Sequence, residues 1–165
     1  MRLISHRGNL WGADPESENR ISKIYECINK GFEVEIDIRC EDDTLFLGHD
    51  KITESISLQT IEQLSDSLWI HCKNAAALNY MTKNSKFYNG KNIFNFFVHE
   101  KDPYTITSQG FIWTYHNAEI LENNCIQVCP EYYFNSLDVK SIKSKLSPHA
   151  HGICSDYIAM VRNHK

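Results

Sequence analysis

The chain has 165 residues and a formal net charge of −4, with 42% hydrophobic and 23% charged residues. These values are ordinary for a globular protein and allow one sizeable core, so we expect a single domain over residues 1–165. They disfavour nucleic acid as a partner and, since no apolar run approaches bilayer length, a transmembrane segment.

The first third of the chain alternates short strands with one helix. Strands are predicted over residues 2–7, 31–39 and 44–47, and a helix over 16–30. The helix follows from apolar side chains at i, i+3, i+4 and i+7, beginning at Ile21, and Gly31 supplies its C-terminal cap. The third strand returns on the second after a charged turn, so we expect a local hairpin there.

The rest of the chain continues this alternation with shorter connections. Strands are predicted at 68–73, 93–99, 110–115, 125–129 and 151–156, and helices at 58–64, 75–81 and 136–145. Alternating strands and helices predict a parallel α/β sheet, and seven or eight strands suggest a closed barrel. Because such barrels usually need about 250 residues, we expect a reduced (β/α) TIM-type barrel with several outer helices shortened or missing. An open doubly wound sheet is the alternative, but no Gly-x-Gly-x-x-Gly follows the first strand.

Two carboxylates share one face of the second strand. Glu35 and Asp37 are two residues apart and therefore point the same way, while Val34, Ile36 and Ile38 point the other way. Acidic side chains on an otherwise apolar strand are costly unless a cation lies between them. Hard oxygen ligands suit magnesium or calcium, so a divalent metal is expected here. The alternative is an exposed strand face with two solvated acids.

Further polar residues end the neighbouring strands. His6, His49 and Lys73 each fall at a predicted carboxyl end, where a β/α barrel places its active site. In sequence order the motifs are His6-Arg7-Gly8, Glu18-Asn19, Glu35-Ile36-Asp37 and Gly48-His49-Asp50. This ordered set resembles the glycerophosphodiester phosphodiesterase family, within the phospholipase-C-like phosphodiesterases, as a short divergent member.

The resemblance implies a metal-dependent phosphodiester hydrolase acting on a glycerophosphodiester or a related small phosphodiester. His6 and His49 would be its acid–base pair, and Arg7 would bind the phosphate. Glu35 and Asp37 would hold the metal. In the family the first step is often attack by a neighbouring substrate hydroxyl, which gives a cyclic phosphate.

The fourth predicted strand departs from the family pattern, which usually has Glu-x-Lys there. Here the residues are His71-Cys72-Lys73, so an imidazole replaces the third carboxylate. We expect His71 to be a metal ligand, for magnesium, calcium or manganese, with zinc as a further option. The alternative is a barrel-core histidine hydrogen-bonded to a neighbour. Lys73 would contact the phosphate as a point charge.

Trp113 and Tyr115 share one face of their predicted strand. We expect Trp113 to wall the substrate pocket, although packing in the core is an equally simple use of an aromatic side chain in a strand. His99 follows the strand before it and could reach the same pocket.

Six cysteines are scattered without a Cys-x-x-Cys pair, and the chain opens directly on a strand without a hydrophobic leader. We therefore expect a cytoplasmic protein with reduced thiols rather than a disulfide framework. Two other functions fit the same motifs: a phospholipase-D-like lyase that forms a cyclic phosphate, and a non-catalytic barrel that binds phosphorylated ligands. The oligomeric state is left open.

Overall fold

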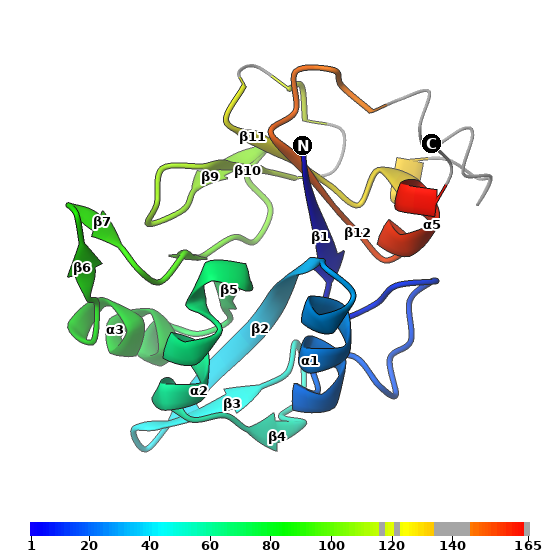
Figure 1. Cartoon of the computed structure of the whole chain (residues 1–165). Coiled ribbons are helices and arrows are strands. Elements are labelled where there is room, and N and C mark those ends of the chain that lie inside the picture. The colour runs from blue at the N-terminus through cyan, green and yellow to red at the C-terminus, as the bar shows by residue number, and fades with distance from the viewer. Residues whose placement is uncertain (116–117, 121–122, 134–145, 164–165) are drawn as a thin grey trace.

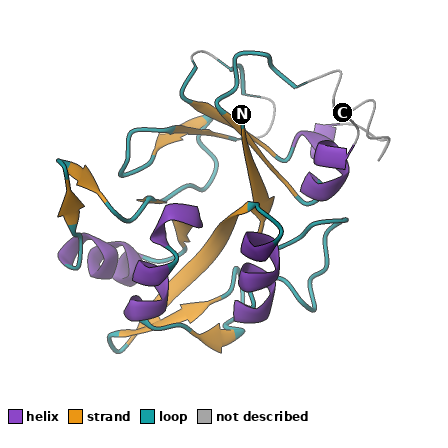
Figure 2. Ribbon diagram, viewed as in Figure 1, coloured by secondary structure: helices purple, strands orange, loops and turns teal. Residues whose placement is uncertain are grey.

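A computed structural model describes residues 1–115, 118–120, 123–133 and 146–163 of a mixed α/β protein (Figures 1 and 2). The strands are β1 Arg2–His6, β2 Glu33–Glu41, β3 Thr44–Leu47, β4 Glu54–Ser55, β5 Leu68–Cys72, β6 Phe87–Tyr88, β7 Lys91–Asn92, β8 Phe96–Phe97, β9 Tyr104–Ile106, β10 Ile112–Thr114, β11 Cys125–Val128 and β12 Gly152–Ser155. The helices are α1 Ile21–Asn29, α2 Leu58–Gln63, α3 Ala75–Lys83 and α5 Ile158–Asn163, with 3-10 turns η1 Ser65–Ser67 and η2 Pro130–Tyr133. None of the helices in these ranges combines the length and apolarity needed to cross a bilayer.

One curled sheet organises the molecule. Its strands run in the order β8-β5-β2-β1-β12-β11-β10-β9, and every neighbouring pair is parallel except β10 and β9. The hairpin of β3 and β4 extends the sheet from the second half of β2, as the sequence predicts for β3. The two edge strands meet at Ser108, whose N–H donates to the Phe96 carbonyl oxygen at 2.8 Å.

The predicted α/β sheet with few outer helices is confirmed, but the closed barrel is only partly formed. The sheet is a half-barrel because β8 and β10 have two and three residues, and β9 runs antiparallel beside β10. A parallel crossover needs a dozen or more residues, and the segment between β8 and β9 is too short to supply one. The helix predicted at 136–145 lies outside the described residues.

Helix α1 begins five residues later than the periodicity predicts, at Ile21 rather than at residue 16. The cause is Asn19, whose φ of +53° interrupts helical geometry. Its side-chain oxygen accepts the Asp37 N–H at 2.9 Å and its amide donates to the Asp37 carboxylate at 2.9 Å. The segment before the helix is therefore used to support β2. Gly31 has a φ of +78° and ends this helix–strand connection, as predicted.

The core has two layers that follow the alternation of β2. Val34, Ile36 and Ile38 face the helices, where α1, α2, α3 and α5 contribute buried apolar side chains. Figure 1 shows α1, α2 and α3 beside β2 and β5, and α5 beside β12. The opposite face, inside the curl, carries a smaller cluster that includes Trp69 and Trp113. Glu35 and Asp37 share that inner face with it, level with the carboxyl ends of β1 and β5.

Candidate active site

The strand register brings the predicted site residues together. His6 pairs with Glu35 between β1 and β2, and Asp37 pairs with His71 between β2 and β5. A cavity of about 320 Å³, called here the central cavity, lies at these strand ends. Its lining includes seven of the predicted site residues: His6, Arg7, Glu35, His49, His71, Lys73 and Trp113. Asp37, the eighth, is buried beside them at 0% exposure.

Glu35, Asp37 and His71 form a compact cluster. His71 Nδ1 lies 3.3 Å from Asp37 Oδ1 and 3.6 Å from Glu35 Oε1, and both carboxylates are buried. Among the described residues, Asp37 Oδ1 accepts no well-formed hydrogen bond. A buried carboxylate oxygen without a donor is costly, so this atom needs a cation nearby.

The second nitrogen of His71 fixes the state of the ring. Nε2 lies 2.8 Å from the His99 carbonyl oxygen, which can only accept, so Nε2 carries a proton. Nδ1 then either offers a lone pair to a metal or takes a second proton and pairs with the carboxylates. Burial disfavours the charged ring, but the Asp37 and Glu35 carboxylates that face Nδ1 outweigh it and raise the pKa of His71 to about 9.

The residues present fit a divalent cation. Glu35, Asp37 and His71 each offer a ligand atom, and these atoms all lie within 4.8 Å of one another. The Nε2–H of His71 bonded to a backbone carbonyl is the orientation that metal-binding histidines usually have. Because one ligand is nitrogen, the cluster favours manganese or zinc more than an all-oxygen site would.

Arg7 is the fixed cation of this cluster. Its Nε lies 3.0 Å from Asp37 Oδ2 and its Nη1 lies 3.1 Å from Glu18 Oε1. Arg7 has a φ of +53°, and its backbone N–H donates to Glu35 Oε2 at 3.2 Å. The guanidinium lines the central cavity, where the sequence predicts a phosphate contact, but it also neutralises Asp37. Arg7 and, when it is protonated, His71 are thus the cations that lie against Asp37, and Arg7 is shared with Glu18.

His6 is held by a buried carboxylate that the sequence analysis does not assign to the site. His6 Nδ1 lies 2.8 Å from Asp156 Oδ1. Asp156 also accepts hydrogen bonds from Asn9 Nδ2 at 2.8 Å and from the Tyr132 hydroxyl at 2.7 Å. Burial disfavours charge on His6, but the hydrogen bond to the Asp156 carboxylate and the negative charge of Glu35 act in the opposite direction and raise the pKa of His6 above its ordinary value.

The loop that carries His49 depends on a glycine. Gly48 has a φ of +137°, and a Cβ there would overlap the Lys51 carbonyl oxygen, so only glycine fits. The Gly48 N–H donates to the Asp37 carbonyl oxygen at 3.0 Å. Arg39 Nη2 donates to the His49 carbonyl oxygen at 2.6 Å. These backbone contacts hold His49 at the rim of the central cavity.

The surroundings of His49 shift the pKa of its ring in the opposite direction to that of His6. Its Nδ1 lies 2.9 Å from Asp50 Oδ1 and its Nε2 lies 3.1 Å from Lys73 Nζ. Burial lowers the pKa of His49, and the positive charges of Arg7 and Lys73 act in the same direction. The Asp37 carboxylate opposes them only in part. His49 is therefore the neutral histidine of the pair, and its Nε2 carries the lone pair.

Trp113 lies between the central cavity and the inner core. It lines the central cavity and also packs in the inner core, 4.6 Å from the Phe97 ring and 5.7 Å from the Trp69 ring between centroids. Phe97 in turn stacks on His71 at 4.9 Å. His99 reaches the cavity as well, packed edge-on against Tyr115. An aromatic wall thus supports the polar cluster.

Three further residues at this site escaped the sequence analysis. Cys129 and Tyr132 line the central cavity, and Asp156 lies behind His6. Two of them could have been found from their position in the sequence, because Cys129 directly follows β11 and Asp156 directly follows β12. Tyr132 lies in the 3-10 turn after β11 and carries no such signal.

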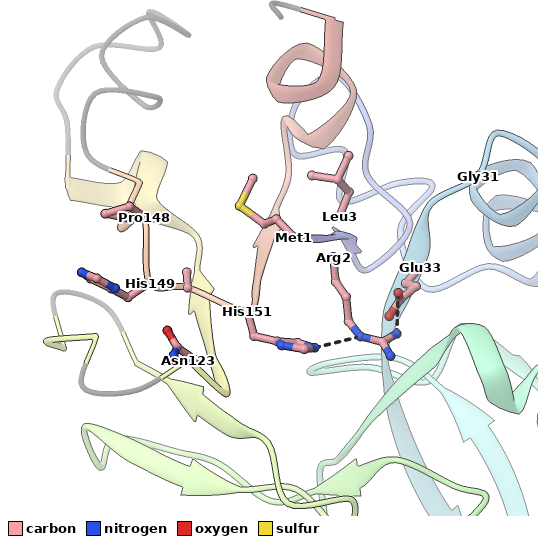
Figure 3. A pocket seen from close by; sticks show the side chains of 10 residues that line it. Met1, Arg2, Leu3, Gly31, Glu33, Asn123, Pro148, His149 and His151 are labelled. Carbon is pink, nitrogen blue, oxygen red and sulfur yellow. Dashed lines mark hydrogen bonds and ion pairs between the residues drawn. The ribbon is translucent and has the colours of Figure 1, made fainter.

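A larger hollow of about 720 Å³ lies at the opposite, amino-terminal end of β1 (Figure 3). Arg2 crosses it and is already paired with Glu33 at 2.7 Å and with His151 at 3.2 Å. Glu33 Oε2 also accepts the Trp69 indole N–H at 2.6 Å. The polar groups in this hollow are thus already paired with one another. The central cavity, in contrast, holds titratable groups whose pKa values are shifted. We place the candidate site in the central cavity for that reason.

Comparisons with known proteins give one structural likeness. No protein-family profile and no curated protein matches the sequence. The structure is similar to a crystal structure of a glycerophosphodiester phosphodiesterase from Thermotoga maritima, with a TM-score of 0.47 and 12% sequence identity. The match covers 100% of this chain and 99% of that chain. A likeness of this size does not assign an activity.

Proposed function

We propose that this protein is a metal-dependent phosphodiester hydrolase for a small phosphodiester such as a glycerophosphodiester. The observation that carries the proposal is a pair of histidines on one cavity with opposite partners: His6 Nδ1 lies 2.8 Å from the Asp156 carboxylate, and His49 Nε2 lies 3.1 Å from the Lys73 ammonium. These partners raise the pKa of His6 and, together with burial, lower the pKa of His49. Titratable groups pushed apart in this way mark an acid and a base.

The cations around the cavity would receive the phosphate. Arg7 and Lys73 both line it, and each can donate hydrogen bonds to phosphoryl oxygens. A divalent cation held by Glu35, Asp37 and His71 would add charge stabilisation to those oxygens when bound.

The proton transfers follow from the two rings. His49 Nε2 accepts from Lys73 Nζ in the resting site. When the Lys73 ammonium turns to a bound phosphate, Nε2 is free to take the proton of the attacking hydroxyl or water. His6, oriented by Asp156, donates its proton to the leaving oxygen. After the reaction His49 carries the extra proton and His6 has lost one. The pair returns to its starting state when His49 releases a proton to solvent and His6 takes one up.

A second candidate, a barrel that binds phosphorylated ligands without cleaving them, is favoured by one observation. Arg7 and a protonated His71 balance the charges of Glu35 and Asp37 with no metal. In that state the cavity still presents cations to a phosphate. The two histidines with opposed pKa shifts favour the hydrolase, since a binder needs no acid–base pair.

Cleavage of glycerophosphocholine with manganese or magnesium, followed by phosphorus NMR, tests the proposal. His6→Asn and His49→Asn should each lower turnover by about a hundredfold or more, the usual scale for losing acid–base help. The control is His149→Asn, which changes a histidine at the opposite end of the sheet. Equal turnover in all four proteins would reject the two-histidine mechanism.

The products separate the catalytic alternatives. A glycerol phosphate product supports the hydrolase, and a cyclic phosphate that accumulates without further hydrolysis supports the phospholipase-D-like lyase. Binding of phosphate or the diester without any cleavage, across a panel of small phosphodiesters, supports the non-catalytic barrel.

A further inference from the structure

A second group of metal-ligating side chains borders the central cavity. His6, Cys129 and Asp156 each offer one ligand atom, and these atoms all lie within 4.8 Å of one another. They stand at the carboxyl ends of β1, β11 and β12, which the pairing of β12 with both other strands makes neighbours. This group shares no residue with the Glu35–Asp37–His71 cluster.

The backbone at Cys129 is shaped to present its thiol. Cys129 has a φ of +41°, in the left-handed region that side chains other than glycine rarely adopt. Two hydrogen bonds hold it there: its N–H donates to the Cys154 carbonyl oxygen at 2.7 Å, and its carbonyl accepts the Tyr132 N–H at 3.1 Å. Strained residues of this kind persist where the surroundings fix them, and they gather at functional sites.

We propose that His6, Cys129 and Asp156 form a second metal site, selective for Zn²⁺, and that zinc bound there inhibits the phosphodiesterase. The binding part stands on the cluster alone. The inhibition part rests on the proposed function, because zinc bound to the His6 ring would displace the proton that His6 donates to the leaving oxygen.

The donor set decides which ion the site takes. A thiolate sulfur, an imidazole nitrogen and a carboxylate oxygen suit zinc, whereas magnesium and calcium prefer oxygen ligands only. Tetrahedral zinc has bonds of about 2.0–2.3 Å and so places its ligand atoms roughly 3.3–3.8 Å apart. The ligand atoms of His6, Cys129 and Asp156 all lie within 4.8 Å of one another, so they bracket this spacing. Three protein ligands leave a fourth position toward the central cavity, which His6 and Cys129 both line.

A reactive cysteine nucleophile is the competing interpretation of Cys129, His6 and Asp156. Cys129 is 1% exposed, and burial raises the pKa of its thiol to about 11, although His6 acts in the opposite direction. A protonated, enclosed thiol is a poor nucleophile. Zinc binding itself displaces the thiol proton, so the same burial does not prevent metal ligation.

Cobalt(II), a spectroscopic substitute for zinc, tests the site without any activity measurement. Titration of the whole protein with Co²⁺ should produce a near-ultraviolet thiolate-to-cobalt charge-transfer band, and Zn²⁺ should abolish it. Cys129→Ser should lack the band. The matched control Cys125→Ala, at the start of the strand that Cys129 follows and equally buried, should keep it. Glu35→Gln with Asp37→Asn should also keep it.

A second variant covers the case in which Cys129→Ser does not fold, as judged by circular dichroism. Asp156→Asn should retain the band but need at least about tenfold more Co²⁺ for half saturation, the usual cost of losing a carboxylate around a metal. A wild-type protein without the band, or a folded Cys129→Ser with it, would overturn the site.

Zinc inhibition is measured with magnesium in excess, each variant against its own uninhibited rate. The half-inhibiting zinc concentration should rise at least about tenfold in Cys129→Ser but not in Cys125→Ala. Equal inhibition of both would place the inhibitory zinc elsewhere and overturn this part. If the protein shows the cobalt band but cleaves no diester, the metal site stands and the proposed function fails.

Discussion

Metal binding at Glu35, Asp37 and His71 should depend steeply on pH because a proton and a metal compete for His71 Nδ1. The sequence alone places this competition near pH 6.5, the range of an ordinary histidine. The structure moves it upward, since the two carboxylates raise the pKa of His71 to about 9. The metal binds the neutral ring, so below that pKa each lower pH unit should weaken binding about tenfold.

Between about pH 6.5 and about pH 8.5 the expected change is therefore about 100-fold, or about 2.7 kcal/mol of apparent binding free energy. Above about pH 9 the affinity should level off. Calorimetric titration with Mn²⁺ in buffers of different ionisation enthalpy measures both the affinity and the number of protons released. One proton should leave for each metal bound at the lower pH.

Two variants sharpen the test. His71→Gln keeps a polar side chain that cannot take a proton, so its manganese affinity should be weaker and nearly independent of pH over this range. His71→Glu restores a third carboxylate and should bind magnesium or calcium more tightly than wild type. A flat pH dependence in wild type, with no proton released, would refute the role of His71 as a ligand.

Three further predictions concern the same cavity. Glu35→Gln with Asp37→Asn should abolish metal binding and diester cleavage together, and unchanged manganese affinity by calorimetry would move the metal elsewhere. With a chelator present, the raised pKa of His71 should add to the free energy of unfolding, by at most about 3 kcal/mol in urea denaturation. This contribution should be full below about pH 6.5 and lost as the pH rises through about 9. His71→Gln should remove this dependence of stability on pH. Asp156→Asn should lower the pKa of His6 and move the alkaline limb of the pH–rate profile down by about one unit or more; a profile that keeps its position would separate Asp156 from proton transfer.

The parts that the sequence predicts well are local. The period-two pattern of β2 places Glu35 and Asp37 on one face and Val34, Ile36 and Ile38 on the other, as the structure has them. The carboxyl ends of the strands could be predicted equally well, because an apolar run that stops at a polar residue marks the edge of the sheet where a site forms. Glu35, His6, His49 and Lys73 rest on these two local signals, whereas Arg7 and His71 rest on the family resemblance; the chemical roles of all of them stay predictions.

The parts that escaped prediction depend on contacts distant in sequence. His6 meets Asp156 only because β1 and β12, at opposite ends of the chain, pair in register. The predicted start of α1 was wrong because Asn19 leaves helical geometry to form hydrogen bonds with Asp37. The periodicity of apolar residues does not indicate such bonds. The half-barrel likewise follows from how β9 pairs with β10 rather than from strand count.

The change of a carboxylate to His71 links the two leading functional proposals. With His71 protonated, Arg7 and the imidazolium lie against Glu35 and Asp37, and we propose that the cavity then binds phosphate through its cations without a metal. With His71 neutral, the same carboxylates have lost one counter-charge and Nδ1 offers a lone pair, so a divalent cation is favoured. The binder and the hydrolase then correspond to two protonation states of one side chain. A third carboxylate could not supply this behaviour, because it would stay ionised beside Arg7 at every physiological pH.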